Sequence, residues 1–114
     1  MPYKRAERVS ALIKKEISDI IQRKIKDPRV GLVSITHVWV SKDLRLAKVY
    51  VSIYGNEHDV REGTSCLKNC SSFIRQELGK RIRLRYIPEI CFIYDPSIME
   101  SIRISEIIRS LKEK

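Results

Sequence analysis

Basic side chains are concentrated in two stretches of the chain. Between positions 75 and 85 the net charge is +4, and the cations there are Arg75, Lys80, Arg81, Arg83 and Arg85. A second group at the N-terminus comprises Lys4, Arg5 and Arg8. Clustered cations of this kind can bind the phosphates and 2′-hydroxyls of folded RNA without reading its bases. The alternative is a solvated helix face with local ion pairs, such as Glu77 with Arg81.

The charge of the whole chain supports a polyanionic partner. Its 114 residues include 23 Lys and Arg against 14 Asp and Glu, which gives a formal net charge of +9. A small basic domain attracts polyanions at long range, so nucleic acid is the first partner class to expect. Composition leaves open the alternative that the charge only keeps the surface soluble.

Carboxylates that could hold a divalent metal ion are available at Asp27, Asp43, Asp59 and Asp95. Metal-dependent phosphoryl chemistry would need several of them around one or two ions. Asp27 and Asp95 each precede a proline, however, and are explained as residues at helix boundaries. The chain has no glycine-rich phosphate loop, no Gly-x-Ser-x-Gly motif and no acid–base pair at a useful spacing. We therefore predict that the protein is not an enzyme and uses no cofactor.

The cysteines and the hydropathy pattern favour a reducing, cytoplasmic location. Cys66, Cys70 and Cys91 are odd in number and too sparse for a disulfide scaffold. Cys66 and Cys70 are four residues apart and could share a metal with a histidine, but no paired ligand motif accompanies them, so we predict buried free thiols and no metal site. No segment approaches the roughly 18 to 20 apolar residues that span a bilayer, and no apolar segment follows the N-terminal charges. Neither membrane insertion nor secretion is expected.

The N-terminal cations belong to a predicted helix over residues 3–26. Its apolar residues recur at steps of three and four and form one stripe, namely Val9, Leu12, Ile13, Ile17, Ile20, Ile21 and Ile25. Asp27-Pro28 ends this helix. Two strands are predicted at residues 32–40 and 46–54, and the short segment between them favours an antiparallel hairpin. In the second strand one face carries Ala47, Val49, Val51 and Ile53.

The basic stretch at residues 75–85 overlaps the end of a helical pattern that runs to about residue 83. Cys70, Ser71 and Ser72 are weak helix formers within it and predict a bend between two half-helices. Residues 89–94 read as a third strand, and a last helix is expected over residues 98–112. This order predicts an α+β fold, a single domain over residues 1–114 in which helices cover a three-stranded sheet.

Three aromatic residues of the predicted hairpin could stack on bases beside Lys48, namely Trp39, Tyr50 and Tyr54. The pattern of the first strand does not settle which face Trp39 occupies. We expect instead that the last helix covers this face and buries the rings as ordinary core. We likewise interpret His37 as an ordinary strand residue with no evident partner.

Several blocks of residues match one protein family in the right order. They are Arg5-Ala6-Glu7-Arg8-Val9, Asp27-Pro28-Arg29-Val30-Gly31, Ser41-Lys42-Asp43-Leu44, Ala47-Lys48-Val49-Tyr50-Val51, Phe73-Ile74-Arg75, residues 85–92 and Asp95-Pro96-Ser97. Through these blocks the core of the chain, residues 5–97, resembles ribosome-binding factor A, a family of bacterial assembly factors for the small ribosomal subunit. The resemblance implies a type II KH-like domain of order α-β-β-α-α-β with a C-terminal helix. The family's Ala-x-Gly kink corresponds to Cys70-Ser71-Ser72, so the glycine is replaced and we expect a bend whose φ stays negative.

The resemblance also implies a role and partners. The protein is expected to act as a monomer on free or immature 30S subunits, contacting 16S rRNA and neighbouring ribosomal proteins through the two basic groups. It would assist late rRNA maturation, including processing at the 5′ end, with importance for growth in the cold. A GTPase is the implied agent of its release. The alternative is a general KH-like RNA or DNA binder unconnected with ribosome assembly.

Overall fold

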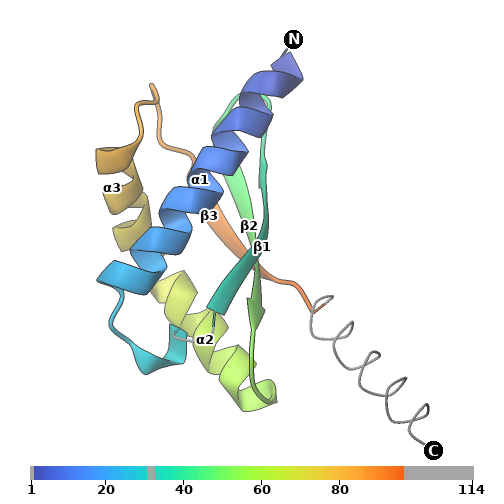
Figure 1. Cartoon of the computed structure of the whole chain (residues 1–114), viewed down its shortest axis with the longest axis vertical. Coiled ribbons are helices and arrows are strands. Elements are labelled where there is room, and N and C mark those ends of the chain that lie inside the picture. Colours follow the sequence, from blue (N-terminus) through green and yellow to red (C-terminus); the bar gives the residue numbers. More distant parts are fainter. Residues whose placement is uncertain (1, 31–32, 97–114) are drawn as a thin grey trace, which may run out of the picture.

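The computed structural model describes residues 2–30 and 33–96 (Figure 1), and the helix expected over residues 98–112 lies outside them. The elements are α1 (Pro2–Lys24), a 3₁₀ turn η1 (Pro28–Val30), β1 (Val33–Val40), β2 (Leu46–Ile53), α2 (Glu57–Asn69), α3 (Ser71–Arg81) and β3 (Glu89–Tyr94). The predicted α+β class is therefore confirmed, and so is the predicted order of elements up to the third strand. None of the helices in this part of the chain has both the length and the apolar composition for crossing a membrane.

The apolar stripe of α1 is the main helical contribution to the core. Val9, Ile13, Ile17, Ile20 and Ile21 are all buried. Leu12, which belongs to the same predicted stripe, is exposed. It follows that the stripe is narrower than predicted, because adjacent residues are about 100° apart around a helix and Leu12 lies at its edge. The helix ends before Asp27-Pro28, as expected.

The sheet is mixed, with β2 in the middle. β1 and β2 are antiparallel neighbours, as the hairpin predicted, and β3 pairs with β2 in parallel on the other side. The sequence pattern had left the pairing of β3 open. A parallel neighbour needs a crossover, which α2 and α3 supply. The predicted inner face of β2 is buried, from Ala47 to Ile53.

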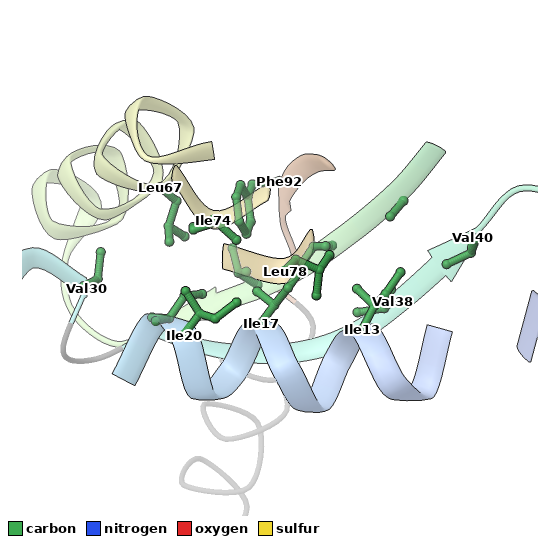
Figure 2. Packing of buried hydrophobic residues seen from close by; sticks show 14 of the residues in the cluster. Ile13, Ile17, Ile20, Val30, Val38, Val40, Leu67, Ile74, Leu78 and Phe92 are labelled. Atoms are coloured by element: carbon green, nitrogen blue, oxygen red, sulfur yellow. The ribbon is translucent and has the colours of Figure 1, made fainter. Parts of the chain in front are cut away.

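The core lies between the helices and one face of the sheet. Figure 2 shows Ile13 beside Val38 and Val40, and Ile20 beside Val30, whereas Leu78 lies next to the middle of α1. The first half of α1 therefore runs along the end of β1 that leads into the hairpin.

The other sheet face is not covered by α1, α2 or α3. Trp39 is paired in register with Lys48, between the buried residues Val38 and Val40, so its ring points away from the helices. Trp39 is 44% exposed and Tyr54 65% exposed. The expectation that these rings are core residues is wrong for both, and His37 is exposed as well. Tyr50 is half-buried.

The predicted bend is a single residue shared by two helices. Cys70 ends α2 and precedes α3, with φ −93° and ψ 1°, so the negative φ is confirmed. Its N–H donates to the carbonyl oxygens of Cys66 and Leu67, and its own carbonyl accepts from the N–H of Ile74. Among the three thiols Cys66 is buried, Cys70 is half-buried and Cys91 is exposed. The prediction of buried thiols is therefore wrong for Cys91.

Candidate nucleic-acid interface

The β1–β2 hairpin loop holds Arg45 in a defined position. The Ser41 N–H donates to the Leu46 carbonyl oxygen at 2.9 Å, and the Leu44 N–H donates to the Ser41 carbonyl oxygen at 2.9 Å. The Asp43 carboxylate accepts from the Ser41 hydroxyl at 2.6 Å and from the Arg45 N–H at 3.1 Å. These bonds, first that from Ser41, lower the pKa of Asp43. This carboxylate therefore has a structural role in closing the loop, in which Leu44 takes a positive φ of 61°.

The segment between α3 and β3 presents two more arginines. Ile82 and Pro88 are buried at its two ends, whereas Arg83 and Arg85 are exposed. Arg75 of α3 holds this segment in place, since its Nη2 donates to the Ile87 carbonyl oxygen at 2.8 Å. Arg75 thus positions this loop.

An exposed tyrosine brings the two loops together. The Cζ atom of Arg45 lies 5.4 Å from the centroid of the Tyr86 ring, and that of Arg85 lies 5.6 Å from it. The Glu89 N–H donates to the Arg45 carbonyl oxygen at 2.8 Å, which joins the hairpin to the start of β3. Arg45, Arg85 and Tyr86 are named the Tyr86 cluster below. Residues about forty positions apart in the chain therefore meet at one end of the sheet.

The start of α1 lies at the same end. Arg5 and Arg8 are exposed and precede Val9, and Figure 2 shows Ile13 beside the last residues of β1. In Figure 1 the beginning of α1, the β1–β2 hairpin and the α3–β3 loop all occupy the upper part of the molecule. The side chain of Lys4 lies outside the described residues. We call the five described cations at this end the basic end: Arg5, Arg8, Arg45, Arg83 and Arg85.

No side chain of the basic end makes an ion pair within the described residues. Asp43 lies beside Arg45 and accepts from its backbone N–H, but no guanidinium group of the basic end contacts a carboxylate there. Cations without such partners can exchange their counterions for phosphate groups.

Arg81 has a different environment from the one that its position in the basic stretch suggests. Its Nη1 donates to Asp19 Oδ2 at 2.5 Å and to Glu16 Oε2 at 3.2 Å, and its side chain is only 22% exposed. The bond from Arg81 lowers the pKa of Asp19, and Asp19 in turn raises the pKa of Arg81. Glu77, the expected ion-pair partner of Arg81, contacts Lys80 Nζ instead, at 3.4 Å. Arg81 therefore connects α3 to α1.

A second polar network joins η1 to α2. Asp27 Oδ2 accepts from Arg29 Nη2 at 2.7 Å, and Arg29 Nη1 reaches Glu62 Oε2 at 3.3 Å. Arg29 holds the pKa of Asp27 well below its ordinary range. The Cys66 thiol donates to Asp27 at 3.4 Å, and burial is the first cause that raises its pKa to about 11. Within residues 2–30 and 33–96, no three His, Cys, Asp or Glu side chains gather where they could hold a metal ion.

Sequence reasoning placed Arg83 and Arg85 beside Arg81 and did not single out Arg45. Arg45 was missed because it does not belong to a dense run of cations, since its charged neighbours within three positions are only Lys42, Asp43 and Lys48. The signal that could have found it is the position of Arg45 directly after the Ser41-Lys42-Asp43-Leu44 block, where a hairpin must bring it to the end of the sheet.

Comparisons with known proteins agree with this architecture. The model of the family described as ribosome-binding factor A matches residues 5–108. A ribosome-binding factor A from Halothermothrix orenii is 47% identical over 114 residues, covering 100% of this chain and 93% of the relative. The crystal structure of ribosome-binding factor A from Thermus thermophilus has a TM-score of 0.70 at 26% identity and covers 78% of this chain and 94% of that one.

A further structural match concerns a ribosomal complex. A homology model of the Thermus thermophilus factor, fitted into a cryo-EM map of its complex with 30S, has a TM-score of 0.64 at 26% identity. It covers 76% of this chain and 91% of that one. The likeness to these structures confirms the KH-like fold that the resemblance implied.

Proposed function

The chain belongs to the ribosome-binding factor A family, and we propose on this basis that it binds the free or immature 30S subunit and assists late 16S rRNA maturation, including processing at the 5′ end. The observation that carries the proposal is the basic end, where five arginines from three separate segments lie at the same end of the molecule and make no ion pair in the described residues. The 30S complex of the Thermus thermophilus relative supports the same partner. Lys4 at the start of α1 belongs to the proposed RNA contacts.

The proposed mechanism is differential binding. A folded domain can favour one rRNA arrangement only by binding it more tightly than the alternatives. Catalysis and a cofactor are not part of the proposal, and release follows from rRNA rearrangement or from a GTPase. We propose that the protein acts as a monomer in the cytoplasm and matters most in the cold, where misfolded rRNA escapes slowly.

The proposed RNA contacts separate the members of the original basic stretch. Arg83 and Arg85 contact rRNA directly, and Lys80 lies on the exposed side of α3, where its bond to Glu77 is long and exposed. Arg75 and Arg81 act by positioning the α3–β3 loop and α3 itself. The bend at Cys70, Ser71 and Ser72 sets the direction of α3, and thereby of that loop.

Co-sedimentation tests the proposal. The protein should pellet with free 30S subunits and not with assembled 70S ribosomes, and Arg8→Glu and Arg85→Glu should each weaken the binding without lowering the thermal midpoint. Equal retention of the wild type on heparin and on 30S subunits would favour the general polyanion binder. Unchanged 30S affinity in both variants would remove the basic end from the site.

A further inference from the structure

The Tyr86 side chain is exposed, yet two guanidinium groups lie over its ring. The residue is 57% exposed, and the Cζ atoms of Arg45 and Arg85 lie 5.4 and 5.6 Å from the ring centroid. Tyr54 is a useful contrast, because it is 65% exposed and none of the described cations lies over its ring. Exposure alone therefore does not bring arginines to a tyrosine ring in this protein.

Contacts that directly follow Tyr86 in the chain fix the segment that carries the ring. The Ile87 carbonyl oxygen accepts from Arg75 Nη2 at 2.8 Å, and the Pro88 side chain is buried. The ring therefore projects from a backbone that α3 holds in place, and its position does not depend on the two cations over it.

Arg45 reaches the ring from the β1–β2 hairpin. The Glu89 N–H donates to the Arg45 carbonyl oxygen at 2.8 Å, which ties the backbone of this arginine to the start of β3. Arg45 has the parity of the buried residue Ala47, so its side chain leaves the hairpin on the side of the sheet that faces the helices. The segment that follows α3 lies on that side as well, and it supplies Tyr86.

The ring keeps two like charges at one place. The faces of a tyrosine ring carry negative partial charge and attract a cation within about 6 Å. Neither Arg45 nor Arg85 makes an ion pair in the described part of the chain. Of the nearby carboxylates, Asp43 accepts from the Ser41 hydroxyl and from a backbone N–H, and Glu89 forms no ion pair among the described residues. Two guanidinium groups are thus held close together without a compensating anion.

We infer that the Tyr86 cluster is a two-arginine clamp for the backbone phosphates of RNA, in which Tyr86 is a positioning residue and the two guanidinium groups contact the phosphates. A guanidinium group can donate two parallel N–H bonds to phosphate oxygens. A free arginine side chain loses rotamer freedom when it binds, and a ring that already holds the side chain lowers this cost before RNA arrives. The inference rests on the proposed function and makes it more specific, because Tyr86 then acts through phosphate contacts and not by stacking on a base.

Fluorescence anisotropy of a labelled RNA duplex of about 12 base pairs, with the full-length protein at low salt, tests the clamp. Bases within a duplex are stacked on their neighbours, so the probe offers phosphates and not free base faces. Tyr86→Leu should weaken binding about three- to tenfold, whereas Tyr86→Phe, which keeps the ring, should retain wild-type affinity. Tyr54→Leu is the matched control and should change nothing. Equal affinities of Tyr86→Leu and Tyr54→Leu, or of Tyr86→Leu and Tyr86→Phe, would overturn the inference, as would a wild type that does not bind the duplex.

The same substitution in the double variant Arg45→Gln, Arg85→Gln separates positioning from direct contact. Because the ring acts only through the two guanidinium groups, Tyr86→Leu should weaken binding no further in this background. A further loss there would overturn the inference, since the ring would then contact RNA itself. Failure of the clamp in these tests, with normal pelleting of the wild type on 30S subunits, leaves the proposed function standing. Conversely, a wild type that does not pellet with 30S subunits would refute the proposed function, whatever the duplex result.

Discussion

The salt dependence of 30S binding should report directly on the basic end. When a protein cation replaces a counterion at a phosphate, it contributes about 0.7 (single strand) to 0.9 (duplex) to the slope of log K against log salt concentration. Neutralising three such cations, in the triple variant Arg45→Gln, Arg83→Gln and Arg85→Gln, should therefore reduce the magnitude of that slope by about 2 to 3. The fold should survive, because these side chains make no ion pair in the described part of the chain.

A matched control separates the position of the charge from its amount. Lys24, Lys26 and Arg61 are also exposed and without an ion pair within residues 2–30 and 33–96, but they lie at the other end of the fold, where α1 ends and α2 begins (Figure 1). Changing all three to Gln lowers the net charge of +9 by the same amount.

The assay measures 30S affinity at four or more salt concentrations for the wild type and both triple variants. Because long-range attraction depends on total charge, both variants should bind more slowly, but only the variant of the basic end should lose slope. Equal slopes in the two variants would refute the reasoning, since they would mean that binding depends on net charge and not on where the arginines lie.

Three predictions concern the framework that holds the site. Arg81→Glu should lower the thermal midpoint clearly more than Arg85→Glu, because it places a third carboxylate beside the two of α1 that Arg81 now contacts; equal midpoints in differential scanning fluorimetry would contradict its structural role. Gly63→Val should cost about 1–3 kcal/mol in urea unfolding, since even a Cβ there would lie 3.0 Å from Ile53 Cδ1; an unchanged midpoint would show that α2 can move away from β2. The pKa of Asp27 is lowered by Arg29 from 3.8, so its contribution to stability is fully present above that value and is lost as pH falls below it; Asp27→Asn should unfold with a shallower pH dependence between pH 4 and 2, and a parallel curve would exclude this carboxylate as a cause of acid unfolding.

Local sequence signals predicted the elements well. The stripe of α1 and the alternation of β2 arise because one face of each element must be buried. The spacing of apolar residues within each element shows which face that is. Asp27-Pro28 ended a helix for a purely local steric reason. The bend at Cys70 also followed from local preferences, and its negative φ is what a residue with a side chain adopts at low cost.

The predictions that failed depended on contacts distant in sequence. Trp39 was expected in the core because the last helix was expected to cover its sheet face, but the ring lies opposite Lys48 on the face away from α1, α2 and α3 and is exposed. Arg81 belonged to a basic stretch by sequence, yet its partners Glu16 and Asp19 lie more than sixty residues earlier. No local pattern contains that information.

The sequence by itself determined the class of fold, the order of the elements and the strong positive charge, because these follow from periodicity, turn residues and composition. Only the tertiary structure decided which cations remain without a carboxylate partner and which rings stay exposed. The physical reason is that the effect of a charge depends on the groups within a few ångströms of it, and chain folding brings those groups from other elements. Folding brings Arg45 and Arg85 to the Tyr86 ring, and it also places Arg81 beside the Asp19 carboxylate of α1.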